Sequence, residues 1–290
     1  MSEMCEEESH QRMALSFALE PGHQYWSRQI AEFGVRTIYE HLYLGVYDSE
    51  KFARVISKVK AFDCDEALHA AHEASSLYIT PSDPLWPVQL NDLDAPPIGI
   101  YVKGNVEALK NRSVAIVGSR NPTPYGTRIA GDFAAGFVDR EWNIVSGGAY
   151  GIDSAAHRGA LVAEGRTIAV IASGIDTPYP SGNSRLFDEI CESGAIISEV
   201  APGVPALPHR FLTRNRIIAA LSQSTLVVEA AFRSGSLRTA RDAAQLLRPV
   251  MAIPGPINSP SSEGCHRLIG ERAAELVTSV ADACELISAL

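Results

Sequence analysis

Two hydrophobic periodicities divide the chain. Up to about residue 75, apolar residues such as Ile38, Leu42 and Ile56 recur at helical spacing in short stretches separated by polar joints. From Pro97 onward, short β-branched runs alternate with amphipathic segments. The pattern predicts a small helical, SAM-like domain over residues 1–77 and an α/β domain over residues 99–290.

Seven apolar runs in the second part predict strands; they cover residues 97–104, 113–119, 143–148, 167–173, 195–200, 224–230 and 250–255. Between them, Ile129, Phe133 and Phe137 share one helical stripe, and so do Leu237, Ala240, Ala244 and Leu247. Continuous apolar strands that alternate with helices are typical of a parallel sheet covered on both faces. We therefore predict a Rossmann-like, doubly wound, mostly parallel sheet preceded by the small helical domain.

Residues 78–98 carry five prolines. Proline lacks the amide donor and clashes with the preceding helical turn, so this stretch cannot hold a long helix. It is predicted to be a Pro-rich linker in which Trp86 packs against a neighbouring domain.

The composition narrows the class of protein. In a chain of 290 residues with 46% hydrophobic residues, no apolar run approaches the roughly 18–20 residues that span a bilayer, so a membrane protein is excluded. The acidic run Glu6–Glu8 replaces the basic start of a signal peptide, which predicts a cytoplasmic location. The cysteines are scattered, without metal-ligand spacing, so we expect reduced thiols and no metal; they are Cys5, Cys64, Cys191, Cys265 and Cys284.

Charge is distributed unevenly along the chain. The net charge of −9 argues against a general nucleic-acid binder, but residues 1–110 hold 17 acidic and 9 basic residues, whereas residues 111–290 hold 17 and 16. All the basic residues after 110 are Arg, whose rigid fork matches phosphate oxygens. A local anion site in the second part is therefore permitted.

Candidate chemistry lies where the predicted strands end, because ligands of doubly wound sheets bind beyond the carboxyl ends of the strands. Gly118, Ser119 and Arg120 follow one strand, and Arg120 is either a phosphate clamp or an ordinary solvated loop residue. Arg120 stands where a dinucleotide fingerprint needs glycine, and no P-loop lysine is present, so NAD and triphosphate sites of these types are not expected.

The next strand end carries Gly147, Gly148 and Gly151, which form either an anion nest or a tight turn with positive φ. Asp153 and His157 share a helix face. They are either an acid/base pair or, the interpretation we favour, a first-turn acid and its partner one turn later.

Two further segments point to an anion. Arg214, Asn215 and Arg216 precede an apolar run and are predicted at the start of a buried helix, where cations are disfavoured unless an anionic ligand offsets the cost. The segment Ser234, Gly235 and Ser236 places hydroxyls and free amides at another helix start, although plain N-capping explains it equally. Glu229 ends an apolar strand and is expected to have an Arg or backbone partner.

Long motifs along the chain resemble one family. They include VAIVGSR (114–120), SGGAYGIDSAAHRGAL (146–161), FLTRNRIIAALS (211–222), VVEAAFRSGSLRTA (227–240) and IPGPINSPSSEGCHRLI (253–269). Their order over roughly residues 78–270 is similar to that of the DNA-processing protein A family, also called DprA or Smf. The resemblance implies a Rossmann-like core without catalytic activity or a cofactor, which binds single-stranded DNA as a homodimer and helps to load the RecA recombinase during natural transformation.

The resemblance also implies site residues. Those implied to bind DNA phosphates are Gly118, Ser119, Arg120, Gly147, Gly151, Asp153, Arg214, Asn215, Arg216, Ser234, Gly235 and Ser236, and Phe211 offers a stacking face. Tyr150 replaces a basic residue that is usual in the family, which implies weaker or differently tuned phosphate binding. The chain ends soon after the core, so no C-terminal winged-helix domain is expected.

Two other functions stay open on the sequence. The same kind of sheet edge resembles the Lonely Guy family of nucleoside-monophosphate phosphoribohydrolases, with Glu229 as the catalytic carboxylate, although that family's P-G-G-x-G-T-x-x-E run is missing. Alternatively, the acidic N-terminal third suits a protein–protein adaptor.

Overall fold

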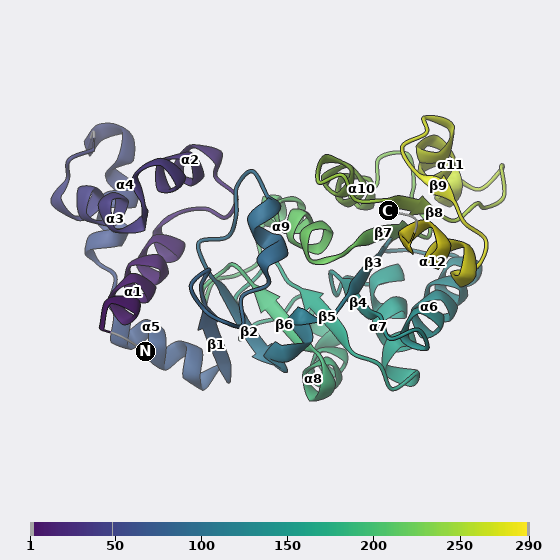
Figure 1. Ribbon diagram of the computed structural model, residues 1–290, viewed down its shortest axis with the longest axis horizontal. Coiled ribbons are helices and arrows are strands. Elements are labelled where there is room, and N and C mark those ends of the chain that lie inside the picture. Colours follow the sequence, from purple (N-terminus) through teal and green to yellow (C-terminus); the bar gives the residue numbers. More distant parts are fainter. Residues whose placement is uncertain (1–2, 48, 289–290) are drawn as a thin grey trace.

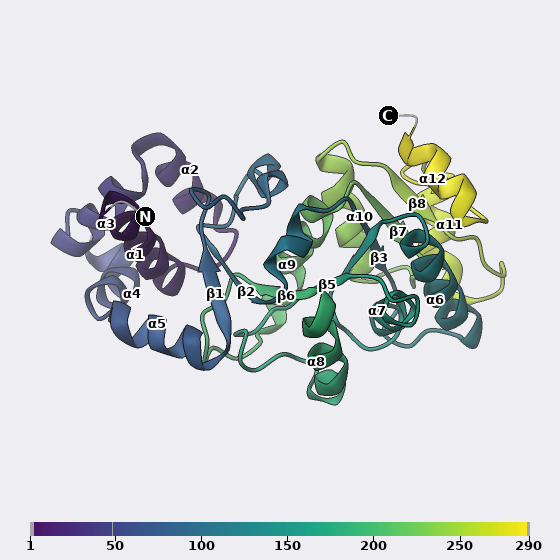
Figure 2. The same ribbon diagram turned by 60° about the horizontal axis from the view of Figure 1, so that its bottom comes forward.

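A nine-stranded sheet forms the centre of the molecule in the computed structural model, which describes residues 3–47 and 49–288. The N-terminal helices lie at one end of this sheet and the C-terminal helix at the other (Figures 1 and 2). The strands are β1 (Ser76–Ile79), β2 (Ile100–Gly104), β3 (Ser113–Val117), β4 (Asn143–Ser146), β5 (Thr167–Val170), β6 (Ala195–Ser198), β7 (Ser224–Val227), β8 (Val250–Ala252) and β9 (Glu275–Leu276).

The strand order is β1-β2-β6-β5-β4-β3-β7-β8-β9. All neighbours from β6 to β9 pair in parallel, whereas β1 with β2 and β2 with β6 pair antiparallel. The predicted mostly parallel, doubly wound sheet is confirmed, and each of the seven apolar runs contains a strand. Two strands are not predicted by the sequence: β1, at the boundary predicted between domain and linker, and β9, which has only two residues.

Side-chain alternation along the central strands builds a layer on each face of the sheet. On β3, the side chains of Ala115 and Val117 belong to the hydrophobic core on one face of the sheet, and those of Val114 and Ile116 belong to the core on the other face. Helices α9 (Pro208–Leu221), α10 (Ser236–Gln245) and α11 (Glu263–Gly270) supply the first face. Helices α6 (Pro124–Val138), α7 (Ile152–Val162), α8 (Ser184–Ser193) and α12 (Val280–Ser288) supply the second.

The predicted apolar stripe of α10 is wrong in its second half. Leu237 and Ala240 are buried as expected, but Ala243 takes the next buried position, and Leu247 is 94% exposed. The helix ends at Gln245, and Leu247 follows it with a φ of 57°, so it no longer lies on the stripe. The stripe of α6 is confirmed, since Phe133 and Phe137 are buried and Ile129 packs against them.

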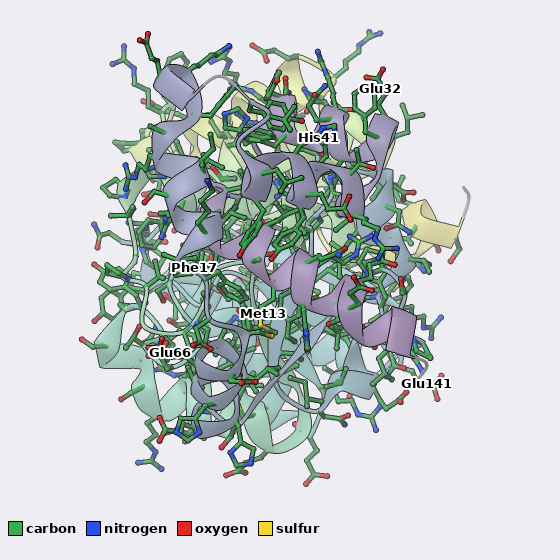
Figure 3. The ribbon with its side chains drawn as sticks, turned by 90° about the vertical axis from the view of Figure 1, so that its left-hand side faces the viewer. Met13, Phe17, Glu32, His41, Glu66 and Glu141 are labelled. Carbon is green, nitrogen blue, oxygen red and sulfur yellow. The ribbon has the colours of Figure 1, made fainter. Side chains whose placement is uncertain are left out.

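The N-terminal helices form a cluster with a separate core. They are α1 (Glu3–Ala18), α2 (Gln24–Phe33), α3 (Val35–Leu44), α4 (Ser49–Lys60) and α5 (Cys64–Glu73). Leu15, Ile38 and Leu42 are fully buried within the cluster. Figure 3 looks onto this end of the molecule, where the carboxylates of Glu32 and Glu66 lie at the surface.

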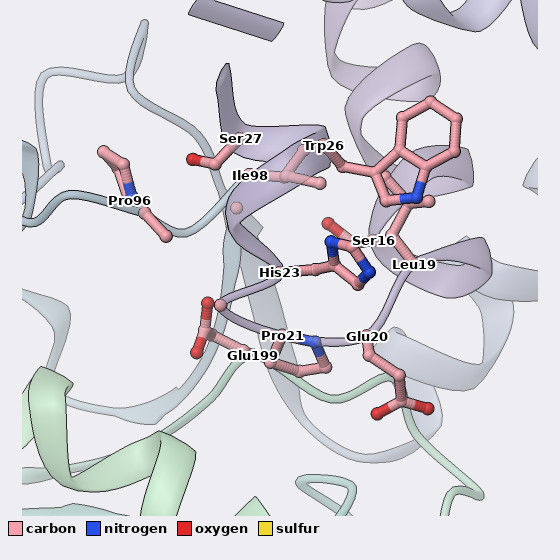
Figure 4. A pocket seen from close by; sticks show the side chains of 13 residues that line it. Ser16, Leu19, Glu20, Pro21, His23, Trp26, Ser27, Pro96, Ile98 and Glu199 are labelled. Atoms are coloured by element: carbon pink, nitrogen blue, oxygen red, sulfur yellow. The ribbon is translucent and has the colours of Figure 1, made fainter. Parts of the chain in front are cut away.

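Polar contacts join this cluster to the sheet. The Ser16 hydroxyl lies 2.8 Å from the Tyr78 hydroxyl, and Arg12 donates to the Ile98 carbonyl at 3.1 Å. Glu20, in the loop between α1 and α2, accepts two hydrogen bonds from Arg210 at 3.0 and 2.9 Å. A small cavity of about 30 Å³ lies at this junction, beside Glu199 (Figure 4).

The proline-rich segment is ordered against the core. It contains the end of β1 and the 3-10 helix Val88–Asp92, which contacts α9. Trp86 is 4% exposed and donates from Nε1 to Asn91 Oδ1 at 3.0 Å.

Cys64, Cys191, Cys265 and Cys284 are free thiols, and the side chain of Cys5 lies outside the described residues. None of the helices that the structure describes is long and apolar enough to cross a bilayer.

Candidate nucleic-acid interface

The order of the strands reverses at β3. The chain proceeds from β3 to β4 on one side, while β7 lies on the other side of β3. The Ser119 amide donates to the Glu229 carbonyl at 2.7 Å, which keeps the segments after β3 and β7 together. Such a reversal leaves a crevice beyond the carboxyl ends of the strands.

A cavity of about 300 Å³, called here the first cavity, occupies this crevice. Nine of the predicted site residues line it; they are Gly118, Arg120, Asp153, Phe211, Arg214, Asn215, Ser234, Gly235 and Ser236. They come from the segment after β3, from α7, from α9 and from the start of α10, and so from segments far apart in the sequence. Two guanidinium groups and one carboxylate line the cavity, so its formal charge is positive.

Arg214 forms the buried cationic part of the first cavity. Its side chain donates to the Val170 carbonyl, and its Nε atom is buried without a hydrogen-bond partner among the described residues. Burial lowers the pKa of Arg214 to about 10, so it stays charged at neutral pH. A buried N–H without a partner favours an acceptor such as a phosphate oxygen.

Arg214, Asn215 and Arg216 do not lie at the start of a helix, which corrects the prediction from the sequence. Helix α9 begins at Pro208, six residues before Arg214, so Arg214 lies in the middle of the helix. The cost of its burial comes from lost hydration, not from the helix dipole. The predicted segment Ser234–Ser236 does lie at a helix start, since α10 begins at Ser236, and Asn215 donates to the Gly235 carbonyl at 3.2 Å.

Backbone amides of the glycine loop before α7 bind the carboxylate of Asp153, which lies in the first turn of that helix. Asp153 Oδ2 accepts from the amides of Gly147 at 3.1 Å and Ala149 at 3.4 Å. Gly148 and Gly151 have φ values of 66° and 85°, as the tight-turn interpretation predicts. The amides of Gly147 and Ala149 therefore already have an acceptor. Burial raises the pKa of Asp153, and the positive charge of Arg214 opposes that rise.

Arg120 and Phe211 form the mouth of the first cavity, and a second aromatic side chain, Tyr179, lies beside Phe211. The exposed Arg120 guanidinium lies over the Phe211 ring, 5.3 Å from its centroid. Phe211 in turn meets Tyr179 edge-on, with centroids 5.5 Å apart, and Tyr179 is half exposed. Such a group offers ring faces to bases next to a cation.

Four predicted residues lie outside the first cavity. Gly147 packs against the Arg214 guanidinium, which leaves no room for a Cβ at this position. Gly151 precedes α7, and Ser119 accepts from the Asn121 amide at 3.1 Å. Arg216 points elsewhere, since its Nη2 donates to both oxygens of Glu199 at 2.6 and 2.8 Å.

Sequence reasoning missed other residues at this site. Val117, Ala149, Leu212, Ile218 and Thr239 line the first cavity without having been predicted. They are mostly apolar, so no chemical signal separates them from core residues. Tyr179 could have been found, because it is an aromatic residue in a loop after a predicted strand.

Glu229 has a backbone partner, as expected, but no Arg within the described residues pairs with it. It is 2% exposed, and its oxygens accept from the Thr123 amide at 2.8 Å and the Thr123 hydroxyl at 2.6 Å. It does not line the first cavity. The carboxylate therefore holds the start of α6.

Replacing Glu229 by Gln is expected to lower the free energy of unfolding by about 1–3 kcal/mol, because one buried acceptor of the Thr123 bonds becomes a donor. Urea unfolding measures the loss. Thr123→Val is the matched control, and the double variant should lose less than the sum of the two single changes. A Glu229→Gln protein as stable as the unchanged chain would contradict this role.

His157 is not the partner of Asp153, which corrects the interpretation favoured from the sequence. The Thr167 hydroxyl donates to the Ile144 carbonyl at 2.8 Å, so it accepts from His157 Nδ1, 2.6 Å away. His157 Nε2 is buried without a partner among the described residues. Burial, assisted by the charge of Arg214, lowers the pKa of His157 to about 3.

Acid is expected to destabilise the protein through His157. The unfolded chain binds this proton near pH 6.5 and the folded chain only near pH 3, so stability falls as pH decreases between these values, by at most about 1.4 kcal/mol per pH unit. Thermal unfolding of the unchanged protein and His157→Leu across this range isolates the contribution. Equal pH dependence in both proteins would contradict it.

The family model of DNA recombination-mediator protein A matches residues 77–288. A putative DNA processing protein DprA of Mycobacterium tuberculosis is 44% identical over 222 residues, covering 72% of this chain and 57% of that protein. DprA of Streptococcus pneumoniae is 44% identical over 200 residues, covering 69% of this chain and 70% of that protein.

Solved structures agree with these matches. The crystal structure of DprA from Streptococcus pneumoniae superposes with a TM-score of 0.83 and 34% identity, covering 96% of this chain and 97% of that one. DNA processing protein A from Helicobacter pylori, whose structure is described by its single-stranded DNA binding mode, gives 0.66 and 29%, covering 74% and 96%. The chain spans a little over half the length of the Mycobacterium tuberculosis relative. From its motifs, its sheet and these matches, the chain belongs to the DNA recombination-mediator protein A family.

Proposed function

We propose that this chain is a non-catalytic, single-stranded DNA-binding protein that holds backbone phosphates at the first cavity. The observation that carries the proposal is the convergence of Arg120 and Arg214 on one cavity beyond β3 and β7. Arg214 supplies a buried donor without a partner among the described residues, and Arg120 stands exposed at the mouth. The single-stranded DNA binding described for the Helicobacter pylori relative supports it.

Selectivity for single strands follows from the mouth of this cavity. Phe211 and the half-exposed Tyr179 offer ring faces, and unpaired bases can stack on them, whereas bases inside a duplex cannot. In this proposal the two guanidinium groups of the first cavity contact phosphates, while Asp153 and Asn215 are already bonded to the backbone of Gly147 and Gly235, so few groups remain to read base edges and binding there is tolerant of sequence.

A catalytic role for Glu229 of the Lonely Guy type is disfavoured by its burial under Thr123. We expect no release of ribose 5-phosphate when the protein is incubated with AMP.

The cellular role that we propose is the one that the resemblance to the family implies. We propose that the chain acts in the cytoplasm as a homodimer, protects incoming DNA during natural transformation, and helps to load RecA. We also retain the division into a helical domain (1–77), a linker (78–98) and a DNA-binding domain (99–290). Light scattering measures the mass in solution, and RecA filament formation on strands covered by single-strand binding protein measures loading.

DNA binding is tested by fluorescence anisotropy of a labelled single-stranded oligonucleotide, with unlabelled duplex as competitor. We expect saturable binding that weakens steeply with salt and resists competition by duplex. Equal competition by duplex would contradict the proposed selectivity, and no binding at low salt would contradict the function.

A further inference from the structure

A second cavity of about 240 Å³ lies on the other side of α9 from the first. Arg216 of α9, Asp242 and Gln245 of α10, and Leu93 and Ala95 of the proline-rich segment line it. Leu212, half exposed, lines both cavities. A strand bound in the first cavity can therefore reach the second without leaving the protein surface.

Two residues that line the second cavity, Arg216 and Asp242, carry buried polar atoms without partners in the described part of the chain. Arg216 donates from Nη2 to Glu199, but its Nε and Nη1 atoms have no hydrogen-bond partner among the described residues. Asp242 is 4% exposed; its Oδ1 accepts from Arg238 at 2.7 Å, and its Oδ2 has no partner within the same described part. Buried polar atoms are nearly always satisfied, so an unpaired donor and an unpaired acceptor on two residues that line the same cavity indicate a ligand or water.

The two groups influence one another. Burial raises the pKa of Asp242, and the charges of Arg238 and Arg216 oppose that rise. A ligand that satisfies both needs an acceptor for the guanidinium and a donor for the carboxylate. The edge of a nucleobase carries both kinds of group side by side.

Charge separates the second cavity from the first. Asp92, Asp94 and Asp242 line it together with Arg216 and Arg238. Asp92 is paired with Arg248 and Arg216 with Glu199, and with these two partners included the carboxylates still outnumber the guanidinium groups, whereas the first cavity has the opposite balance. A phosphate is disfavoured by this excess of carboxylates. A neutral heterocycle is not, and Leu93, Ala95 and Leu246 supply apolar surface for its faces.

We propose that the second cavity binds a nucleobase of the strand whose phosphates occupy the first cavity, with Arg216 donating to the base and Asp242 accepting from it. This inference rests on the proposed function. It assigns Arg216 to a base edge, where the resemblance implied a phosphate. It also gives the protein a base preference that phosphate contacts alone cannot provide.

The test is Asp242→Asn, which puts an amide where the carboxylate oxygen Oδ2 has no partner among the residues that the structure describes. Affinities are measured for thymine oligonucleotides of equal length in which every third base is adenine, cytosine or guanine. The unchanged protein should bind these oligonucleotides with affinities that differ by about two- to tenfold. In Asp242→Asn the order of preference should change, while the slope of affinity against salt stays the same because the same phosphates remain bound.

Asp188→Asn, which removes an exposed carboxylate on α8, is the matched control and should leave the order of preference unchanged. Gln245→Trp is a second variant at an exposed position, in case Asp242→Asn does not fold. Its indole should fill the second cavity, so that the variant binds the three oligonucleotides with equal affinity. An order unchanged in both folded cavity variants would overturn the inference, whereas an unchanged protein that binds no strand at all would overturn the proposed function instead.

Discussion

Replacing Arg214 by Met is expected to lower the free energy of unfolding by about 3–5 kcal/mol at pH 7. The change leaves Asp153 buried at 7% exposure without the cation that favours its charged form. The two amide bonds from Gly147 and Ala149 remain but do not replace a full charge. Urea unfolding followed by circular dichroism measures the loss, with the midpoint as the readout.

The double variant Arg214→Met with Asp153→Asn is the control. It removes both charges, so it should recover part of the stability lost in Arg214→Met alone. If Asp153→Asn lowers the free energy of unfolding as much in the Arg214→Met variant as in the unchanged protein, the two side chains are not coupled. The electrostatic account of the cavity floor would then be wrong.

Reversing the charge of Arg120 has the largest expected effect on DNA binding. Arg120→Glu should lower the affinity for every single-stranded sequence by about 10- to 100-fold near physiological salt, because attraction to a phosphate becomes repulsion. Stability should hardly change, since Arg120 is exposed and lies over the Phe211 ring at the surface. Anisotropy titration measures the affinity.

Arg166→Glu is the matched control for Arg120→Glu. Arg166 is also exposed, but it directly precedes β5, so it lies at the N-terminal ends of the parallel strands, whereas the first cavity lies beyond their carboxyl ends. The same fall in affinity in both variants would mean that overall charge, and not the cavity, holds the strand.

Buried and exposed residues of the site have different roles. Arg214 and Asp153 lie buried and act as a fixed charged floor, whereas Arg120, Phe211 and Tyr179 lie at the mouth, where a strand first meets the protein. Floor variants should therefore change stability and binding together, and mouth variants should change binding alone.

Much of the fold followed from the sequence because the parallel strands are buried on both faces and read as continuous apolar runs. Each run from 97–104 to 250–255 contains a strand. β1 was missed because four residues before a proline-rich segment give no alternation to detect. The end of α10 was misplaced because periodicity alone does not show that a helix stops before Leu247.

The candidate site was predicted less evenly. Strand ends meet at one edge of a sheet, so Gly118, Arg120 and Ser234 came together as expected. The direction of a helical side chain depends on which face packs, and the sequence did not show that Arg214 and Arg216 face different cavities. It also could not show that Asp153 already binds the amides of the glycine loop.

The central claim is that phosphates of a single strand are held at the first cavity by Arg120 and Arg214. It is tested most directly by the slope of log affinity against log salt for the unchanged protein and Arg120→Glu. The magnitude of the slope should fall in the variant by about 0.7 for each phosphate that the variant no longer neutralises. A slope that is the same in both proteins would contradict the claim.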